Sequence, residues 1–495
     1  MDFLESLFGN SLTASSAAFL FLALGLALAF EFVNGFHDTA NAVATVIYTN
    51  SLKPTVAVVW SGIWNLIGVL TSSGAVAFGV IALLPVELVL NVGTGAGFAM
   101  VFALLLAAII WNLGTWYLGL PASSSHTLIG SILGVGLANS WVIPGHVFGE
   151  GVNWSKATEI GISLLVSPLV GFSLAAGLLL LCKQLIKNAE LYTAPEKGQP
   201  PPLWIRAILV LTCTGVSFAH GSNDGQKGMG LVMLILIGLV PSIYAVNLAP
   251  GPADIQQFER TAIEMRVVLD KYVTATPMQR EAAAIELSQY LKSSGTASAD
   301  TFSALSVKNR EIGETLAGKS SIRELSEVQR SELRSNMYLV AESIAKLGKS
   351  GKINEPDLAP LNGYRGSIDA FTKFIPEWVK LAVAVALGLG TMIGWKRIVV
   401  TVGEKIGKEH LTYAQGASAE LVAMTTIGAA DILGLPVSTT HVLSSGVAGT
   451  MFANKSGLQM GTVKSLALAW LLTLPACIGL GAGLFILFMK LFVKG

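Results

Sequence analysis

The amino-acid sequence predicts an all-α membrane protein: a polytopic helical bundle of two inverted repeats, with re-entrant helical hairpins and a soluble helical insert. Three observations predict this fold. Hydrophobic residues make up 52% of the 495 residues and charged residues 13%, which is unusual for a soluble domain. Apolar runs reach the ~20 residues that a helix needs to cross a bilayer. Two different polar motifs each occur twice along the chain.

The spacing of these doubled motifs indicates an internal duplication. The copies are NGFHDTANA at 34–42 with HGSNDGQKG at 220–228, and LPASSSH at 120–126 with LPVSTTH at 435–441. Asp38 and His126 are 88 residues apart, whereas Asp224 and His441 are 217 apart. The excess is close to the length of one polar stretch in the second half. Without that stretch the halves share one spacing, which is typical of a transporter whose substrate site lies between two repeats.

Composition changes along the chain predict its domains. We expect a first transmembrane repeat at 1–182, a linker at 183–203, a second transmembrane repeat at 204–249 and 377–495, and a soluble helical insert at 250–376. The insert holds about half of all charged residues, and its stretches 255–273 and 322–348 have helical spacing. The basic linker and the basic loop that begins at Lys396 should both be cytoplasmic.

Apolar runs predict the membrane segments. These lie near 16–33, 55–84, 97–119, 125–140, 158–182, 204–219, 228–247, 378–394, 412–430, 440–453 and 463–492. The segments 125–140 and 440–453 are short and follow closely on apolar runs. We therefore expect them to be arms of re-entrant hairpins, whose irregular tips must be covered by protein or line a wet cavity.

Charge and cysteine content exclude several classes of function. A net charge of +1 gives no electrostatic reason to bind nucleic acid. The cysteines Cys182, Cys213 and Cys477 are far apart in apolar surroundings, which favours simple packing over a zinc site or a disulfide framework.

The first doubled motif places one acid in each half, Asp38 and Asp224, at the polar end of an apolar run. An uncompensated carboxylate at such a position costs several kcal/mol. The neighbours that can compensate it are His37 and Asn41 in the first copy, and Asn223 and Lys227 in the second. The alternative is an ordinary loop in water just past a helix end. Two copies at matching spacing favour a functional site.

The second doubled motif predicts an anion site at a helix start. Proline ends the segment before it, and the hydroxyl residues can cap the helix that follows. The free N–H groups of such a helix start attract anions. Additional hydroxyl donors are Ser124, Ser125, Thr439 and Thr440, and secondary candidates are Ser123, His126, Ser438 and His441. Plain capping without a ligand is the alternative, and the two histidines are either proton carriers or structural hydrogen-bond partners.

Together the two motifs pose an electrostatic problem. A dianionic oxyanion cannot lie beside two ionised carboxylates at low dielectric constant without a positive charge between them. Either a cation bridges them, or a protonated Asp donates its hydrogen to the ligand. The Lys227 ammonium can occupy the space of a sodium ion, and His37 can accept or deliver protons. The sequence therefore predicts coupling groups at His37, Asp38, Asp224 and Lys227.

The chain resembles the inorganic phosphate transporter (PiT) family, most closely its bacterial low-affinity Pit branch. The residues that carry the resemblance are GFHDTANA at 35–42, GSND at 221–224 and both Pro-x-Ser-x-x-His stretches. The resemblance covers essentially every membrane segment. It implies an inverted-repeat helical fold, phosphate as substrate and coupling to sodium or protons. For the Pit branch it also implies neutral metal–phosphate complexes among the species carried.

Carried over by position, the family's acidic residues fall on Asp38 and Asp224, its amide partners on Asn41 and Asn223, and its hairpin-tip hydroxyls on Ser124, Ser125, Thr439 and Thr440. The chain departs from the family pattern in both copies. His37 replaces the usual Asn, and Gly225-Gln226-Lys227 stands where Val-Ala-Asn is usual. The loss of that second Asn weakens the case for a sodium site and favours proton coupling.

We therefore predict a proton-coupled phosphate symporter, multi-pass in the bacterial inner (plasma) membrane, and not an enzyme. Its partners are inorganic phosphate and membrane lipid, without nucleic acid. No cofactor is expected beyond the co-transported proton and, as an option, a divalent cation complexed with phosphate. A homodimer and any metal ligands are left open. The alternatives are sodium coupling, sulfate transport by the same fold, and a membrane phosphate-ester hydrolase, for which no nucleophile–base pair is recognisable.

Overall fold

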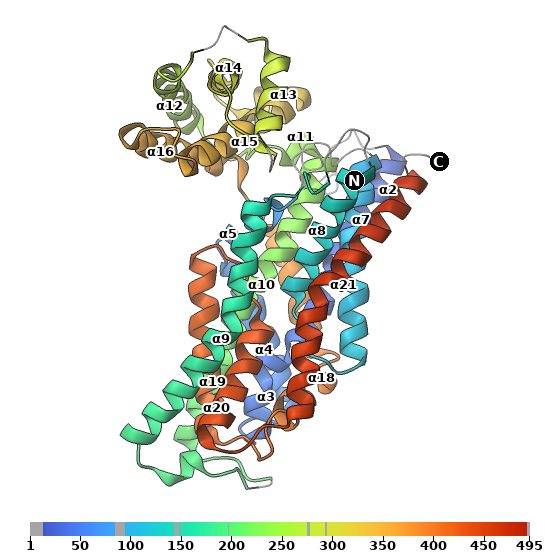
Figure 1. Ribbon diagram of the computed structural model, residues 1–495, viewed down its shortest axis with the longest axis vertical. Coiled ribbons are helices and arrows are strands. Elements are labelled where there is room, and N and C mark those ends of the chain that lie inside the picture. The colour runs from blue at the N-terminus through green and yellow to red at the C-terminus, as the bar shows by residue number, and fades with distance from the viewer. Residues whose placement is uncertain are drawn as a thin grey trace.

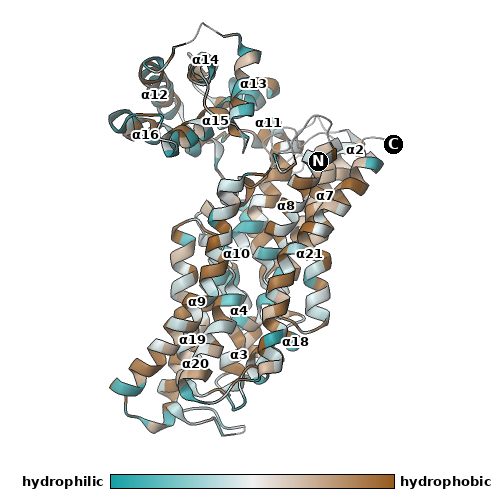
Figure 2. Ribbon diagram, viewed as in Figure 1, coloured by the Kyte–Doolittle hydropathy of each residue, from teal (hydrophilic) through white to brown (hydrophobic). Residues whose placement is uncertain are grey.

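The computed structural model describes residues 13–84, 95–142, 148–150, 152–196, 198–274, 278–292 and 295–492. These residues form helices, and one isolated β-bridge joins Gly407 to Leu458. Figure 1 shows a long helical bundle with a smaller helical body at one end. Apolar residues dominate the bundle, whereas the smaller body mixes polar and apolar residues (Figure 2). The predicted all-α membrane fold is confirmed.

The bundle is built from two sets of helices that are separated in sequence by the linker. The first set is α2 (Ala14–Asp38), α3 (Ala40–Tyr48), α4 (Pro54–Thr71), α5 (Ala75–Ile81), α7 (Gly95–Tyr117), α8 (Ser124–Val142) and α9 (Trp154–Leu185). The linker contains the 3₁₀ turn η1 (Ala189–Tyr192). The second set is α10 (Leu203–Leu239), α11 (Pro241–Tyr244), α17 (Glu377–Met392), α18 (Lys396–Glu404), α19 (Tyr413–Ile432), α20 (Thr439–Asn454) and α21 (Met460–Phe492).

Within the described residues, six helices are long and apolar enough to cross a membrane. They are Ala14–Tyr48, Pro54–Thr71, Gly95–Tyr117, Ala157–Leu185, Leu203–Leu239 and Met460–Leu491. A bent pair formed by α16 (Glu355–Thr372) and α17 can raise the count to seven. The predicted short helices after each Pro-x-Ser motif are present as α8 and α20. Their re-entrant path stays a prediction.

Three of the predicted membrane segments are wrong in their boundaries. The segment 204–219 and the part 228–239 of the next one belong to one continuous helix, α10, so Asp224 lies inside a helix and not at its end. Some polar residues there make tertiary hydrogen bonds, such as that from Gln226 Nε2 to Asp431 Oδ1 at 2.5 Å. Conversely, the segment 55–84 is divided into α4 and α5 around Gly74, whose φ of +86° lies in the left-handed region that favours glycine.

The two halves pack against each other through equivalent pairs of helices. α8 of the first half packs on α21 of the second, and α20 packs on α9. A Cβ atom on Gly134 of α8 would overlap with the Ile478 carbonyl, and one on Gly449 of α20 with the Phe172 carbonyl. Glycine therefore permits the same close helix approach at both places. α2 begins and α10 ends near the insert, so these helices run in opposite directions (Figure 1). Inversion of the repeats stays a prediction, which these directions support.

The insert is a separate helical body. It contains α12 (Pro252–Asp270), α13 (Arg280–Leu291), α14 (Ala299–Leu316), η2 (Ile322–Glu324), α15 (Glu327–Lys349) and α16. Its apolar core includes Phe258, Leu305 and Tyr364. Arg334 ties it to the bundle, because its guanidinium donates to the Ala245 and Thr372 carbonyls on the two connecting segments. The helical stretches expected at 255–273 and 322–348 correspond to α12 and to η2 with α15, while the domain boundaries stay predictions.

The two basic connections lie at the same end of the bundle. The linker and α18 are both found at the end opposite the insert (Figure 1). Contacts agree with this placement, because Asn50 after α3 donates to the Glu196 carbonyl of the linker and α18 packs on α3. Both basic segments can therefore face the cytoplasm together, as the charge rule expects.

Candidate substrate site

The candidate site lies where α2 breaks into α3 and meets α10 and the first turns of α8 and α20. Thr39 lies at the break, and its hydroxyl is within hydrogen-bond distance of the Gly35 carbonyl and, at 2.9 Å, of the Thr391 carbonyl of α17. α2 ends at Asp38. A Cβ atom on Gly35 would overlap with the Leu387 carbonyl, so glycine is needed for α17 to approach this closely.

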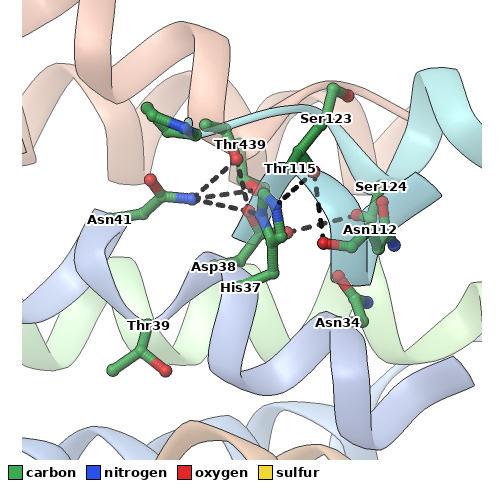
Figure 3. A network of polar contacts seen from close by, with 12 residues as sticks. Asn34, His37, Asp38, Thr39, Asn41, Asn112, Thr115, Ser123, Ser124 and Thr439 are labelled. Atoms are coloured by element: carbon green, nitrogen blue, oxygen red, sulfur yellow. Dashed lines mark hydrogen bonds and ion pairs between the residues drawn. The ribbon is translucent and has the colours of Figure 1, made fainter. Parts of the chain in front are cut away.

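Asp38 is the centre of a dense set of hydrogen bonds (Figure 3). Its carboxylate is 2% exposed. Oδ1 accepts hydrogen bonds from the Thr440 hydroxyl and from Asn41 Nδ2, the latter at 3.2 Å. Oδ2 accepts one from Ser124 Oγ at 3.2 Å. Asn41 Nδ2 also contacts the hydroxyls of Thr440 at 3.1 Å and Thr439 at 3.5 Å. Asp38 thus joins the starts of α8 and α20.

Asp224 lies next to Asp38, although 186 residues separate them in sequence. Ser124 Oγ reaches Asp224 Oδ2 at 3.4 Å as well as Asp38. The Lys227 ammonium, itself fully buried, lies 2.7 Å from the same Asp224 oxygen. Among the described residues, Asp224 Oδ1 has no hydrogen-bond partner. The two acids of the doubled motif therefore share one buried centre.

His220 is a residue of this centre that the sequence did not identify. Its Nε2 atom lies 3.6 Å from Asp38 Oδ2 and 3.5 Å from Asp224 Oδ2. Its Nδ1 atom lies 2.8 Å from Asn65 Oδ1, while the Asn65 amide donates to Thr391. Nδ1 therefore carries a proton, and a second proton on Nε2 suits the two carboxylates that it faces. His220 is four residues before Asp224, a spacing that puts both on one helix face.

The helix starts are capped by the first serine of each motif. Ser123 Oγ accepts a hydrogen bond from the His126 N–H at 3.2 Å, and Ser438 Oγ accepts one from the His441 N–H at 3.1 Å. The predicted capping is therefore present in both copies. The two histidines face each other, with ring centroids 4.6 Å apart. Because both helices start beside Asp38, their free N–H groups converge on one place.

Three other candidates make their contacts outside this centre. His37 Nε2 lies 3.1 Å from the Thr115 hydroxyl, and its Nδ1 is 4.0 Å from Asp38 Oδ1 (Figure 3). Ser125 Oγ donates to the Val437 carbonyl at 2.7 Å. Asn223 Nδ2 donates to the Leu435 carbonyl at 3.1 Å. Ser125 and Asn223 thus hold the second Pro-x-Ser loop in place, whereas His37 Nδ1 lies near Asp38 without a hydrogen bond to it.

The centre also offers a donor set for a metal ion. Ligand atoms of Asp38, His220 and Asp224 all lie within 4.8 Å of one another, and the three residues are buried. Carboxylate oxygens suit hard divalent cations, and imidazole suits transition metals. Lys227 competes with any such ion for Asp224.

A charge count constrains what the centre can hold. Two carboxylates, the ammonium of Lys227 and a doubly protonated His220 sum to zero. A dianion added to this buried set is uncompensated unless two positive charges accompany it.

The fold and the site together define a membrane transporter for a small anion. The fold is a polytopic helical bundle, and its centre holds two convergent helix starts, hydroxyl donors and buried acid–base groups. The family model described as "Phosphate transporter family" matches residues 34–481. The chain therefore belongs to the phosphate transporter family, whose substrate is phosphate.

Curated relatives and one solved structure agree with this assignment. The chain is similar to the low-affinity inorganic phosphate transporter PitB of Escherichia coli, with 43% identity over 490 residues, 95% of this chain and 97% of the relative. PitA of the same species is 42% identical over 480 residues, 94% of this chain and 96% of the relative. A solved structure titled "The sodium-dependent phosphate transporter" has a TM-score of 0.53 at 19% identity, covering 96% of this chain and 100% of that chain. This last likeness shows the fold alone.

These comparisons confirm several sequence predictions. The family is the one that the motifs resemble. The relatives are named as transporters, so the prediction that the chain is not an enzyme is confirmed. The multi-pass bacterial inner-membrane protein is confirmed by the bacterial relatives and the apolar helices.

Proposed function

We propose that the protein is a secondary active symporter that carries inorganic phosphate together with protons. The observation that carries this proposal is that the carboxylates of Asp38 and Asp224 both lie within hydrogen-bond distance of the Ser124 hydroxyl. Ser124 donates to Asp38 and Asp224, and Thr440 donates to Asp38. A phosphate oxygen is also an acceptor, so it competes with the carboxylates for these donors.

Phosphate is held by the starts of α8 and α20. Their free N–H groups and the positive ends of their dipoles attract the dianion. The hydroxyls of Ser124, Thr439 and Thr440 and the amide of Asn41 are the proposed side-chain donors. Ser123 and Ser438 fix the helix starts, and Ser125 and Asn223 hold the second Pro-x-Ser loop.

Competition for donors produces the coupling. When a phosphate oxygen takes the hydrogens of Ser124 and Thr440, Asp38 and Asp224 lose the groups that stabilise their charge. A proton on a carboxylate removes this charge and turns an acceptor into a donor for phosphate. Phosphate and protons therefore load together. His220 and His37 are placed to pass the protons, and the Lys227 ammonium compensates the acid that stays ionised.

A divalent metal–phosphate complex is a second neutral cargo. It requires His220 to lose the proton on Nε2, because a ligating imidazole nitrogen is unprotonated. Asp38, His220 and Asp224 are then the ligands for the metal ion, which is part of the cargo. Sodium coupling is the main alternative, and the solved structure with a similar fold is that of a sodium-dependent phosphate transporter. The Lys227 ammonium, 2.7 Å from Asp224, occupies the place of a small cation there and favours protons. Membrane lipid and a homodimer stay predictions.

Uptake of labelled phosphate by Asp38→Asn and Asp224→Asn variants tests this proposal. Each variant removes an ionisable group of the coupling machinery. It also replaces a charged hydrogen-bond acceptor by a neutral one, and a hydrogen bond to a charged group contributes ~1.5–3 kcal/mol. We expect uptake to fall roughly 100-fold while the variant still reaches the membrane. The exposed Asp300→Asn in the insert is the control. Wild-type uptake in either site variant would remove that acid from the mechanism, and full competition by sulfate would overturn the choice of phosphate.

A further inference from the structure

Glu31 is a fully buried carboxylate in the membrane bundle, and the phosphate chemistry above does not use it. It lies on α2, seven residues before Asp38, which is two helical turns or about 10 Å along the same helix face. Its exposed fraction is 0%. Ionisable side chains in membrane helices are costly to keep, so each one points to a function.

The Glu31 carboxylate has incomplete hydrogen bonding. Oε2 accepts a hydrogen bond from Asn34 Nδ2 at 3.3 Å. Oε1 has no partner among the described residues. An ionised carboxylate normally accepts several hydrogen bonds, whereas a protonated one requires fewer acceptor contacts and supplies a hydrogen of its own. The surroundings of Glu31 thus suit a group that spends part of the transport cycle protonated.

Glu31 faces the charged segment of α10. A Cβ atom on Gly228 would overlap with Glu31 Cγ and lie 2.6 Å from Glu31 Oε1. Gly228 therefore has to be glycine for this acid to lie against the residue that follows Lys227. Glu31 interacts electrostatically with Lys227, Asp224 and His220.

The other helices packed on α2 bring little charge to Glu31. The described sequence of α7 contains no Asp, Glu, Lys, Arg or His. α17 has one ion pair, Glu377 with Lys380 at 3.3 Å, in its first turn. α2 itself adds His37 and Asp38 at its end, and His126 of α8 interacts with Lys227. Among these charged groups, Lys227 therefore has the largest electrostatic interaction with Glu31.

We propose that Glu31 is a second proton-binding site of the transporter, on the insert side of the phosphate site, and that Lys227 links its protonation to phosphate binding. The proposal rests on the proton coupling inferred above. In loading, the Glu31 carboxylate binds one proton from water and becomes neutral. In unloading, the O–H bond breaks, the electron pair stays on Glu31 and the proton returns to water.

The linkage between protonation of Glu31 and phosphate binding is positive, which is the direction that symport requires. A neutral Glu31 leaves the positive charge of Lys227 to Asp224 and to the incoming phosphate. An ionised Glu31 adds a negative charge beside Lys227 and opposes a dianion. Proton binding at Glu31 and phosphate binding at the centre therefore strengthen each other, and the effect is reciprocal.

Glu420 of α19 provides a matched comparison. It is also fully buried. However, both of its oxygens accept hydrogen bonds, one from the Thr45 hydroxyl and one from the Thr212 hydroxyl. Its surroundings are neutral hydroxyls, in contrast to the lysine beside Glu31. A carboxyl-to-amide change at Glu420 therefore controls for the loss of a buried acid in the bundle.

The test uses the full chain in proteoliposomes and compares two transport modes. Net accumulation of labelled phosphate under an imposed proton gradient requires proton binding and release. Exchange of internal unlabelled for external labelled phosphate does not. We expect Glu31→Gln to lose accumulation at least tenfold, to keep exchange within about threefold, and to weaken the pH dependence of that exchange, since the groups of the phosphate site still titrate. Glu31→Asp should restore part of the accumulation, and Glu420→Gln should keep both modes.

Accumulation by Glu31→Gln at the wild-type level would overturn the assignment. Loss of exchange together with accumulation would also contradict it, because Glu31 would then serve phosphate binding or the fold. If the wild-type protein responded to sodium and not to protons, the proposed function itself would be wrong, which is a separate result from either outcome for Glu31.

Discussion

The two copies of the acidic motif have the same spacing but carry different charges. Three residues after the acid, the first copy has Asn41 and the second has Lys227. Four residues before it, the first copy has Asn34 and the second has His220. The second half thus supplies the cationic groups of the centre, where the first half has amides. The two copies thus share the spacing of the motif and differ in the charges that they bring to the centre.

The difference extends one helical turn further from the acid. Seven residues before it, the first copy has Glu31 and the second has Ser217, whose hydroxyl donates to Ser61 at 2.9 Å. Here the first half supplies the charge. Because Glu31 lies against Gly228 of α10, the extra acid of one copy lies beside the segment that carries the extra lysine of the other. The two halves thus bring buried groups of opposite charge to facing segments of α2 and α10.

The Pro-x-Ser motifs differ less. Both first serines cap their helices. The next hydroxyls take unequal roles, because Ser124 contacts both acids while the equivalent Thr439 accepts from Asn41. The anion-binding helix starts thus remain alike, and the coupling groups do not.

The largest effect is expected from Lys227→Asn, which gives the second copy the residue of the first. Removing one partner of a buried ion pair costs about 3–5 kcal/mol, so proton-driven uptake should fall at least 100-fold. With the ammonium gone, a cation can approach Asp224, and an imposed sodium gradient should now stimulate uptake. The exposed Lys271→Asn in the insert is the control. Unchanged proton-driven uptake would show that the charge asymmetry has no role.

An intermediate effect is expected from His220→Asn, which copies Asn34. The imidazole between the two acids is lost, and the amide that replaces it cannot titrate. We expect roughly tenfold slower uptake, in line with ~1–2 kcal/mol for a charged hydrogen-bond partner, and a flatter dependence of uptake on pH between 5 and 8. A pH profile with the wild-type shape would exclude His220 from proton transfer.

The smallest effect is expected from the pair Ser124→Ala and Ser125→Ala. Ser124 donates to both acids, so its loss should raise the KM for phosphate about three- to tenfold, as one or two hydrogen bonds of ~1 kcal/mol predict. Ser125 donates to the Val437 carbonyl, and its loss should change KM less than twofold. Equal KM values in the two variants would contradict the placement of Ser124.

The sequence was sufficient to predict the acids and the helix starts, because each is marked by a repeated local pattern. It did not identify His220, although this residue opens the second copy. The polar stretch around it is typical of the end of a span, and only a continuous helix puts His220 and Asp224 on one face. The close approach of α10 to α4 requires glycine at position 221, where a Cβ atom would overlap with the Asn65 carbonyl, and such contacts are not visible in one sequence.

Glu31 lacks a repeated pattern. It is a single acid inside a largely apolar run, which indicates a candidate functional group in a membrane helix, and the hydroxyl contacts that set Glu420 apart from it are seen only in the structure. The doubled motifs drew attention to positions that the repeats share. Glu31 is present in only one copy, so comparison of the copies for their differences is the step that finds it.

Flux of labelled phosphate into proteoliposomes, with proton and sodium gradients imposed separately, tests the central claim most directly. The account requires that phosphate enters the buried centre only with compensating protons or as a neutral metal complex. An inward proton gradient should therefore drive accumulation without sodium, and a membrane potential alone should have little effect. Accumulation driven by sodium alone, with no response to the proton gradient, would contradict the account.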